Sequence, residues 1–267
     1  MSLGPVVVTL PRLFFLLGLL TVILAAHWFE RRTGKNVETP IWWSILVGVV
    51  LARLSYVATH LSDYRDQPLQ ALYFWQDGYL PLAGMAATVV AALLFSIRRS
   101  QRAKPLLVPL LAGILIWSSA TWVSRALIAN HDARLPELTV REVSGTPVAL
   151  AGFRGQPVVL NLWATWCPPC RREMPVLAQA QQARNDVHLV FLNQGEEEQV
   201  VRHYLATEAL PLRNVLLDSQ RRAGREFSTV AMPTTLFFDA EGKLVDTHVG
   251  ELSRARLSDY LRRIAAP

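Results

Sequence analysis

Long apolar runs dominate the first half of the chain. Four of them come close to the roughly 20 residues that a helix needs to cross the hydrocarbon core of a bilayer. One such run alone could be a buried helix of a soluble protein, but four of them within 130 residues favour insertion into a membrane. We therefore predict four transmembrane helices, at about residues 13–29, 41–58, 80–97 and 105–123.

The pattern changes after about residue 129. Short apolar runs, which predict β-strands, alternate there with stretches that predict helices. Strands are expected at 138–143, 147–150, 158–163, 187–193, 215–217, 236–238 and 244–249, and helices at 170–184, 196–207, 219–227 and 254–264. This alternation, which ends in a hairpin, predicts an α/β domain with a mixed central sheet flanked by helices. The chain thus consists of an all-α four-helix transmembrane domain over 1–130, a polar connector, and an α/β domain over 136–267.

The first apolar run has an alternative interpretation as a secretory signal peptide. A signal peptide carries positive charge before its apolar core and a small-residue cleavage site after it. Here the cluster of Arg31, Arg32 and Lys35 follows the run, and residues 27–29 form a poor cleavage context. We therefore expect the first helix to be retained.

The net charge of +6 resides entirely in the first half of the chain. Residues 1–130 contain 11 Lys and Arg against 5 Asp and Glu, whereas residues 131–267 contain 16 of each class. The basic balance therefore comes from the flanks of the apolar runs, where positive charge sets membrane orientation. It gives no indication of nucleic-acid binding, and we expect no nucleic-acid partner.

The loop charges predict how the four helices cross the membrane. The first and third loops, residues 30–40 and 98–104, together hold seven positive residues, whereas the second loop, residues 59–79, holds only Arg65. Loops rich in Lys and Arg stay in the cytoplasm. The N-terminus and the α/β domain are therefore expected on the periplasmic side of a bacterial inner membrane, a compartment where disulfides persist.

Arg53 lies within the second predicted span, near its outer end. A charge inside a membrane is a candidate functional residue, although a long side chain can also extend to the interface. The surrounding segments, 51–56 and 75–84, resemble the N-terminal part of the prolipoprotein diacylglyceryl transferase family, whose later spans are missing here. Family histidine and glycine positions are occupied by Leu82, Asp77 and Ala83. The resemblance implies a shared membrane scaffold and a lipid-binding groove, and it argues against transferase activity.

The stretch with the most informative chemistry is residues 161–175, in which an apolar strand runs into a helix. It contains Cys167 and Cys170, the only two cysteines of the chain. Two cysteines separated by two residues can form a small disulfide and reopen it. The free N–H groups and partial positive charge at a helix N-terminus favour a thiolate, and a thiolate is the species that attacks a disulfide.

A pair of cysteines with this spacing can also bind a metal ion. Zinc sites normally use four ligands, and the chain has no second cysteine pair. Three histidines of the α/β domain, His188, His203 and His248, are scattered without ligand spacing, and we interpret them as surface or strand residues. We therefore expect no metal and no other cofactor, with a two-thiolate copper(I) site as the alternative.

Residues 163–175, together with residues 232–235, resemble the thioredoxin fold and, within it, the TlpA/ResA-like thiol–disulfide oxidoreductases. The resemblance covers nearly all of the α/β domain. It implies a redox-active disulfide in which Cys167 is the exposed attacking thiol and Cys170 is the resolving thiol. It also implies a cis peptide bond before Pro233, opposite the dithiol.

The same resemblance indicates further site residues. Thioredoxin has a buried aspartate where this chain has Asn161, and an amide cannot carry a proton. Glu173, which matches a glutamate of the TlpA/ResA-like pattern, is the candidate proton carrier, with an ordinary solvated helix residue as the alternative. Trp166, Met232 and Pro233 are expected to contact the substrate, with the backbone of Met232 pairing with a bound peptide.

These expectations describe a membrane-anchored, periplasm-facing thiol–disulfide oxidoreductase, with the role of a reductase favoured. Its expected partners are periplasmic protein disulfides or dithiols, the lipid bilayer, and a separate transmembrane thiol reductant, because the predicted spans contain no cysteine. A copper(I) carrier using the same cysteine pair is one alternative. A lipid-binding membrane module with an accessory redox domain is another. The direction of electron flow stays open at this point.

Overall fold

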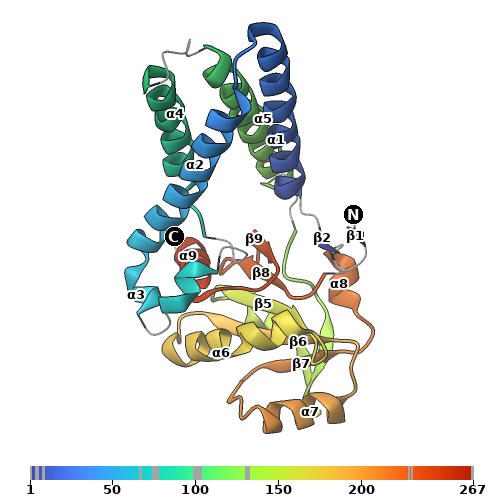
Figure 1. Cartoon of the computed structure of the whole chain (residues 1–267). Coiled ribbons are helices and arrows are strands. Elements are labelled where there is room, and N and C mark those ends of the chain that lie inside the picture. Colours follow the sequence, from blue (N-terminus) through green and yellow to red (C-terminus); the bar gives the residue numbers. More distant parts are fainter. Residues whose placement is uncertain are drawn as a thin grey trace. The chain divides into compact units, whose positions relative to one another are not determined.

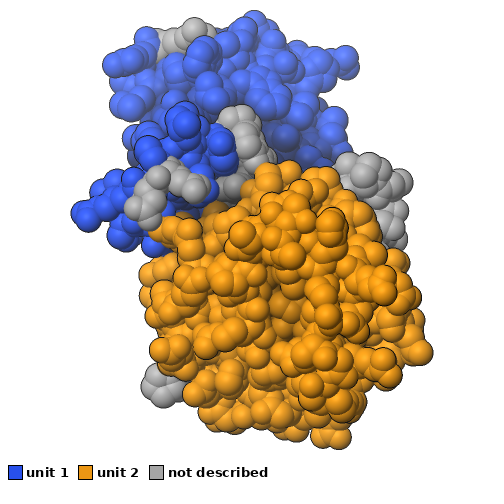
Figure 2. Space-filling model, turned by 90° about the horizontal axis from the view of Figure 1, so that it is seen from below, with its two compact units in different colours: residues 1–130 blue, residues 131–267 orange. Residues whose placement is uncertain are grey.

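The structure is a computed structural model of the whole chain, and its elements are shown in Figure 1. It describes residues 2–3, 6–7, 10–65, 68–73, 78–98, 104–129, 133–227, 229 and 231–265, with side chains from residue 13 onward except 124–129. Parts of the sequence-based expectations lie outside these residues, namely Trp75, Gln76 and Asp77, most of the third loop, the start of the connector, and Val230. The chain divides into two compact units, Met1–Asn130 and His131–Pro267, which are coloured separately in Figure 2.

The first unit is built from four long helices, α1 (Leu10–Thr33), α2 (Glu38–Thr59), α4 (Pro81–Arg98) and α5 (Lys104–Ala129). All four are long and apolar enough to cross a membrane, as the sequence predicted. Most of them extend beyond the apolar runs, because backbone hydrogen bonding continues into the polar flanking residues. The shorter elements of this unit are β1 (Ser2–Leu3), β2 (Val6–Val7), α3 (Leu61–Tyr64) and a 3₁₀ helix at Pro68–Leu72.

Glycines bring the long helices of the first unit together in two pairs, α1 with α5 and α2 with α4 (Figure 1). A Cβ added to Gly84 would lie 2.8 Å from the Cβ of Ala52, and one added to Gly48 would lie 2.8 Å from the carbonyl oxygen of Gly84. The carbonyl oxygen of Gly113 would lie 2.9 Å from a Cβ added to Gly18. Small residues of this kind let helix backbones approach closely in a membrane, where packing rather than the hydrophobic effect drives helix association.

The exposed surface of the four helices is strongly apolar. An apolar cluster with members on all four helices consists of Val22, Ala26, Val37, Ile41, Ala92, Leu106 and Leu110. Large side chains outside it are exposed, including Leu24, Trp43, Leu54, Leu94 and Leu115. Soluble proteins rarely expose contiguous apolar surface on this scale, and lipid chains provide the matching environment. The first unit is therefore a membrane region.

Arg53 of α2 is buried within the first unit, with 8% of its surface exposed. Its guanidinium donates hydrogen bonds to the carbonyl oxygens of Gln70 (3.0 Å), Ala71 (3.1 Å), Tyr73 (3.3 Å) and Gly78 (2.8 Å). The side chain is therefore hydrogen-bonded within its own unit. It holds the backbone of the segment between α2 and α4, and these four carbonyl groups satisfy a charge that would otherwise be very unfavourable in this environment.

The second unit contains a seven-stranded mixed sheet with the strand order β4-β3-β7-β6-β5-β8-β9. The strands are β3 (Thr139–Glu142), β4 (Pro147–Ala149), β5 (Val158–Trp163), β6 (His188–Gln194), β7 (Val215–Asp218), β8 (Thr234–Phe238) and β9 (Leu244–Val249). β5, β6 and β7 are parallel to one another, whereas β8, β9, β3 and β4 pair antiparallel with their neighbours. All six residues of β5 are buried, which explains why its sequence is apolar except for Asn161.

Helices cover both faces of this sheet, which confirms the predicted fold class. They are α6 (Pro168–Ala183), α7 (Glu198–Thr207), α8 (Arg222–Glu226), α9 (Arg254–Ile264) and a 3₁₀ helix at Leu150–Phe153. One apolar cluster packs side chains of α6, α7 and α9 against the sheet, and a second cluster includes Leu150 and Ala223 on the other face. α8 begins later than predicted because the Asp218 carboxylate accepts the N–H groups of Arg222 and Ala223.

The close packing of α2 and α4 generates a prediction about Gly84. We expect Gly84→Leu to lower the stability of the detergent-solubilised protein by about 1–3 kcal/mol, because the new side chain would overlap with Ala52 on α2. Ala86 lies two residues further along the same helix and is exposed, so Ala86→Leu serves as the matched control. Thermal unfolding of both variants tests this, and equal midpoints would contradict the proposed helix contact.

Candidate active site

The site forms where β5 meets α6. β5 ends at Trp163, and Cys167 is the N-cap residue of α6, with an extended backbone (φ −91°, ψ 105°). Pro168 and Pro169 occupy the first helical positions, where a missing N–H group has no unfavourable effect. The N–H group of Cys170 donates a hydrogen bond to the Sγ atom of Cys167 over 3.3 Å. The sequence therefore places the first sulfur at the positive end of the helix.

Cys167 and Cys170 form a disulfide with an S–S distance of 2.11 Å and a Cα–Cα distance of 5.3 Å. Contrary to the expectation of an exposed attacking thiol, Cys167 is only 3% exposed in this oxidised form, and Cys170 is fully buried. Both cysteines belong to the apolar cluster that contains Trp163 and Met174, which explains their burial. The neighbouring Trp166, in contrast, is 60% exposed and presents a large aromatic surface to solvent.

Glu173 lies one helical turn after Cys170, and both side chains are buried on the same side of α6. Its Oε1 atom accepts a hydrogen bond from Asn161 Nδ2 (2.7 Å), and its Oε2 atom accepts one from the N–H group of Leu252 (2.9 Å). Asn161 Nδ2 also donates to Thr235 Oγ1 over 3.0 Å. The carboxyl group is thus held between β5, β8 and the turn before α9, and it is not a solvated helix residue.

Burial raises the pKa of Glu173 from 4.5 to about 8. The largest cause is desolvation, which disfavours the charged carboxylate. The hydrogen bonds from Asn161 and Leu252 act in the opposite direction and lower the pKa, while the nearby negative charge of Glu251 raises it further. The result is a carboxyl group that can gain or lose a proton near neutral pH.

Met232 and Pro233 lie directly before β8, and Thr235 lies within β8, opposite Asn161 of the neighbouring strand β5. The peptide bond between Met232 and Pro233 is cis, in agreement with the expectation. Met232 is partly buried and packs against the apolar cluster that contains both cysteines, and Pro233 is buried. A cavity of about 310 Å³ beside Met232 is lined by Leu162, Gln194, Arg221, Gly224, Arg225, Thr229 and Ala231.

The structure adds Glu196 to the residues that support the site. Its Oε2 atom accepts hydrogen bonds from the N–H group of Thr165 (2.7 Å) and from Asn193 Nδ2 (2.6 Å), and its Oε1 atom accepts one from the Thr165 hydroxyl (2.5 Å). Thr165 is two residues before Cys167, so the carboxylate fixes the loop that carries the first sulfur. The sequence predicts Glu196 as the first residue of a helix, but α7 begins at Glu198.

A sequence signal for this contact existed. β5 and β6 are parallel neighbours, with Trp163 opposite Asn193. The residues that follow the ends of parallel neighbouring strands meet at the same edge of the sheet. Thr165 and Glu196 each come two residues after the end of their strand, so a hydroxyl group and a carboxylate at these positions are a candidate pair.

The raised pKa of Glu173 predicts how stability depends on pH. Between pH 4.5 and about 8 the folded state holds the Glu173 proton more tightly than the unfolded chain, so stability falls as pH rises through this window. The loss amounts to up to about 5 kcal/mol. We expect Glu173→Gln to remove this decline in pH-dependent unfolding of the C-terminal unit within the full chain. Parallel curves for both proteins would contradict the prediction, and Glu241→Gln, at an exposed turn residue, is the control.

Comparisons with known proteins agree with this geometry. Residues 130–264 match the model of the Redoxin family, and residues 1–120 match the model described as prolipoprotein diacylglyceryl transferase. The thiol-disulfide oxidoreductase ResA of Bacillus subtilis is 28% identical over 154 residues, which cover 57% of this chain and 84% of that protein. The thioredoxin-like protein YneN of the same organism is 28% identical over 161 residues, covering 58% and 94%.

The solved structures that are similar to this chain include a thiol:disulfide interchange protein of the thioredoxin family from Chlorobium tepidum. It is 26% identical, with a TM-score of 0.46, and the match covers 51% of this chain and 98% of that chain. The Redoxin match spans half of the present chain and all of its cysteine chemistry. The chain therefore belongs to the Redoxin family, with the thioredoxin-like fold and the cysteine pair of a thiol–disulfide oxidoreductase.

Proposed function

We propose that the protein is a membrane-anchored reductase of protein disulfides that works on the periplasmic side of a bacterial inner membrane. The observation that carries this proposal is the arrangement of the Cys167–Cys170 disulfide at the start of α6 with the buried carboxyl group of Glu173 one turn behind it. A pair of this kind exchanges electrons with other disulfides without a cofactor.

The exchange proceeds in two steps. In the reduced protein the thiolate of Cys167 attacks one sulfur of a partner disulfide, forms a mixed disulfide with it, and releases the second partner sulfur as a thiolate. Cys170 then loses its proton and attacks the Sγ atom of Cys167, which restores the disulfide and releases the first partner sulfur. The partner gains two electrons and the cysteine pair loses two. The same steps in reverse oxidise a dithiol.

Glu173 accepts the proton that Cys170 loses in the second step. Cys170 is fully buried, so water cannot readily take up this proton. The Glu173 carboxyl group is buried on the same helix face, and its pKa of about 8 is close to that of an ordinary thiol, about 8.5. Proton transfer between groups of similar pKa is efficient in both directions. Asn161 and Leu252 hold the carboxylate in place to receive the proton.

Trp166 and Met232 form the surface that meets the partner protein, and the buried Pro233 fixes the backbone of Met232 next to it. Trp166 is largely exposed beside the disulfide, and Met232 packs against the cluster that contains the two cysteines. The cavity beside Met232 is a candidate position for a side chain of the partner. Because aromatic and apolar contacts tolerate different sequences, this surface suits several protein substrates rather than one.

The distribution of positive charge supports a periplasmic location for the second unit. Arg31 and Arg32 lie in the last turn of α1, Arg98 lies in the last turn of α4, and α5 begins at Lys104. These helix ends therefore face the cytoplasm, and the opposite ends of the four helices, including the one that leads into the second unit, face the periplasm. Disulfides are chemically stable in that compartment.

The first unit anchors the protein but does not supply electrons. Both cysteines lie in the second unit, so a separate transmembrane thiol reductant must reduce the Cys167–Cys170 disulfide after each cycle. Arg53 already donates four hydrogen bonds to backbone carbonyls of its own unit, which supports a structural role for this arginine rather than headgroup binding. We therefore regard the lipid bilayer as the environment of the first unit and not as its substrate.

Trapping of partners tests the dithiol chemistry. We expect the full chain with Cys170→Ser to accumulate mixed disulfides through Cys167, because the step that resolves them is lost. The matched control Cys167→Ser retains only Cys170, which is fully buried, and should trap no partner. Non-reducing gels followed by mass spectrometry give the measurement. The copper carrier would be supported instead if Cys170→Ser formed no adducts and the wild-type protein held one equivalent of copper(I).

Labelling of introduced cysteines tests the orientation. In a background with both native cysteines replaced by serine, Gln199→Cys places a thiol on the exposed surface of α7, and Asn36→Cys places one in the first loop. We expect a membrane-impermeant maleimide to label the first variant in intact spheroplasts and the second only after lysis. The reverse pattern would show that the second unit faces the cytoplasm.

A further inference from the structure

One peptide group lies between Glu173 and a buried histidine. The N–H group of Leu252 donates to Glu173 Oε2 over 2.9 Å, and the carbonyl oxygen of the same peptide group, that of Glu251, lies 3.3 Å from His248 Nε2. His248 is on β9 and is 4% exposed. The imidazole and the carboxyl group thus contact opposite ends of a single amide.

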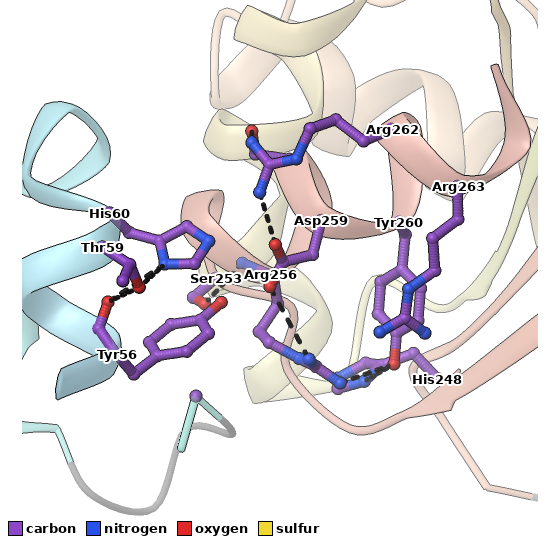
Figure 3. Close-up of polar contacts among 12 residues, drawn as sticks. Tyr56, Thr59, His60, His248, Ser253, Arg256, Asp259, Tyr260, Arg262 and Arg263 are labelled. Carbon is purple, nitrogen blue, oxygen red and sulfur yellow. Dashed lines mark hydrogen bonds and ion pairs between the residues drawn. The ribbon is translucent and has the colours of Figure 1, made fainter. Parts of the chain in front are cut away.

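The neighbours of His248 determine which ring nitrogen carries the proton. Tyr260 lies on α9, its hydroxyl accepts a hydrogen bond from Arg256 Nη2 over 3.0 Å, and it lies 3.4 Å from His248 Nδ1 (Figure 3). Since Arg256 is a donor only, the tyrosine hydroxyl is directed with its own proton to Nδ1. The proton of the neutral imidazole is then on Nε2, which donates to the carbonyl oxygen of Glu251.

We infer that His248 is a positioning residue for Glu173 that acts through the peptide group between Glu251 and Leu252, with Tyr260 and Arg256 fixing its orientation. This inference rests on the proposed role of Glu173 as the proton carrier. It gives a role to His248, which the sequence alone indicates only as a surface or strand residue.

The physical effect is polarisation of the amide. A hydrogen bond to the carbonyl oxygen draws electron density toward it and makes the N–H group of the same amide a stronger donor. The stronger donor favours the charged carboxylate of Glu173 and lowers the pKa of this residue. Cooperative strengthening is about 10–30% per bond. Applied to a hydrogen bond with a charged group, it lowers the pKa of Glu173 by roughly 0.1–0.7 of a pH unit.

Other charged groups near the relay act in known directions. The Glu251 carboxylate raises the pKa of Glu173 and is itself paired with Arg172 of α6 over 2.6 Å. Further charged side chains around His248 and Tyr260 are paired with each other, Arg256 with Asp259 (3.8 Å) and Arg263 with Asp246 (2.8 Å). Substitutions at His248 leave these ion pairs in place, so their contribution is constant in the comparison below.

The inference is tested by measuring the protonation of Glu173 directly. Infrared difference spectra of the oxidised full chain in detergent follow its carboxyl band with pH, and Glu173→Gln identifies the band by its absence. We expect His248→Leu, which removes the donor, to raise the midpoint by roughly 0.1–0.7 of a pH unit. His248→Gln, which can place an N–H donor near the same position, should restore most of the wild-type value, and exposed His203→Leu should change nothing.

Two outcomes would overturn the inference. One is an unchanged midpoint in folded His248→Leu, and the other is an equal shift in His248→Gln. Should His248→Leu fail to fold, Tyr260→Phe serves in its place, because it removes the hydroxyl that orients His248 and keeps the ring that stacks on Phe237 at 4.3 Å. It should shift the midpoint in the same direction, and no shift would overturn the inference. The readout uses unreactive oxidised protein, so it stays valid if the proposed reductase activity is absent.

Discussion

The site depends on the burial of one carboxyl group. Glu173 lies where α6 packs against the sheet, and water is excluded from both of its oxygen atoms by the strand that delivers the dithiol and by the turn before α9. Desolvation raises its pKa to about 8, and two donors keep the charged form accessible. A solvated glutamate would remain charged at neutral pH and could not exchange a proton with a thiol. The apolar packing of α6 therefore stabilises the fold and also raises the pKa of Glu173 into the range that proton exchange with a thiol needs.

Each of the two units buries an ionisable side chain that is hydrogen-bonded by backbone groups. In the membrane region Arg53 is satisfied by four backbone carbonyl groups, and in the second unit Glu173 is satisfied in part by a backbone N–H group. Backbone partners cannot be removed by substitution and have fixed positions, so they hold a charged side chain with little freedom. For Arg53, these hydrogen bonds hold four backbone carbonyl groups of the segment between α2 and α4. For Glu173, desolvation raises the pKa more than the hydrogen bonds lower it, so the carboxyl group titrates near neutral pH.

Sequence patterns predicted the features that local physics controls. The four apolar helices and the strand-to-helix junction at Cys167 follow from hydropathy and capping rules, and the structure has both. Contacts between distant segments were missed. Glu196 has the sequence signature of a helix start, yet it binds Thr165, 31 residues earlier, because β5 and β6 are neighbours in the sheet. The burial of Cys167 and the amide between Glu173 and His248 likewise depend on packing that no local pattern contains.

The central claim is that Glu173 takes the proton from Cys170 when the mixed disulfide is resolved. The most direct measurement is the rate at which a preformed mixed disulfide between Cys167 and a peptide thiol decays, recorded against pH for the wild type and for Glu173→Gln. We expect the variant to be roughly 100-fold slower or more and to lack the inflection at about pH 8 that is expected for the wild type. Equal rates with the same pH profile in both proteins would contradict it.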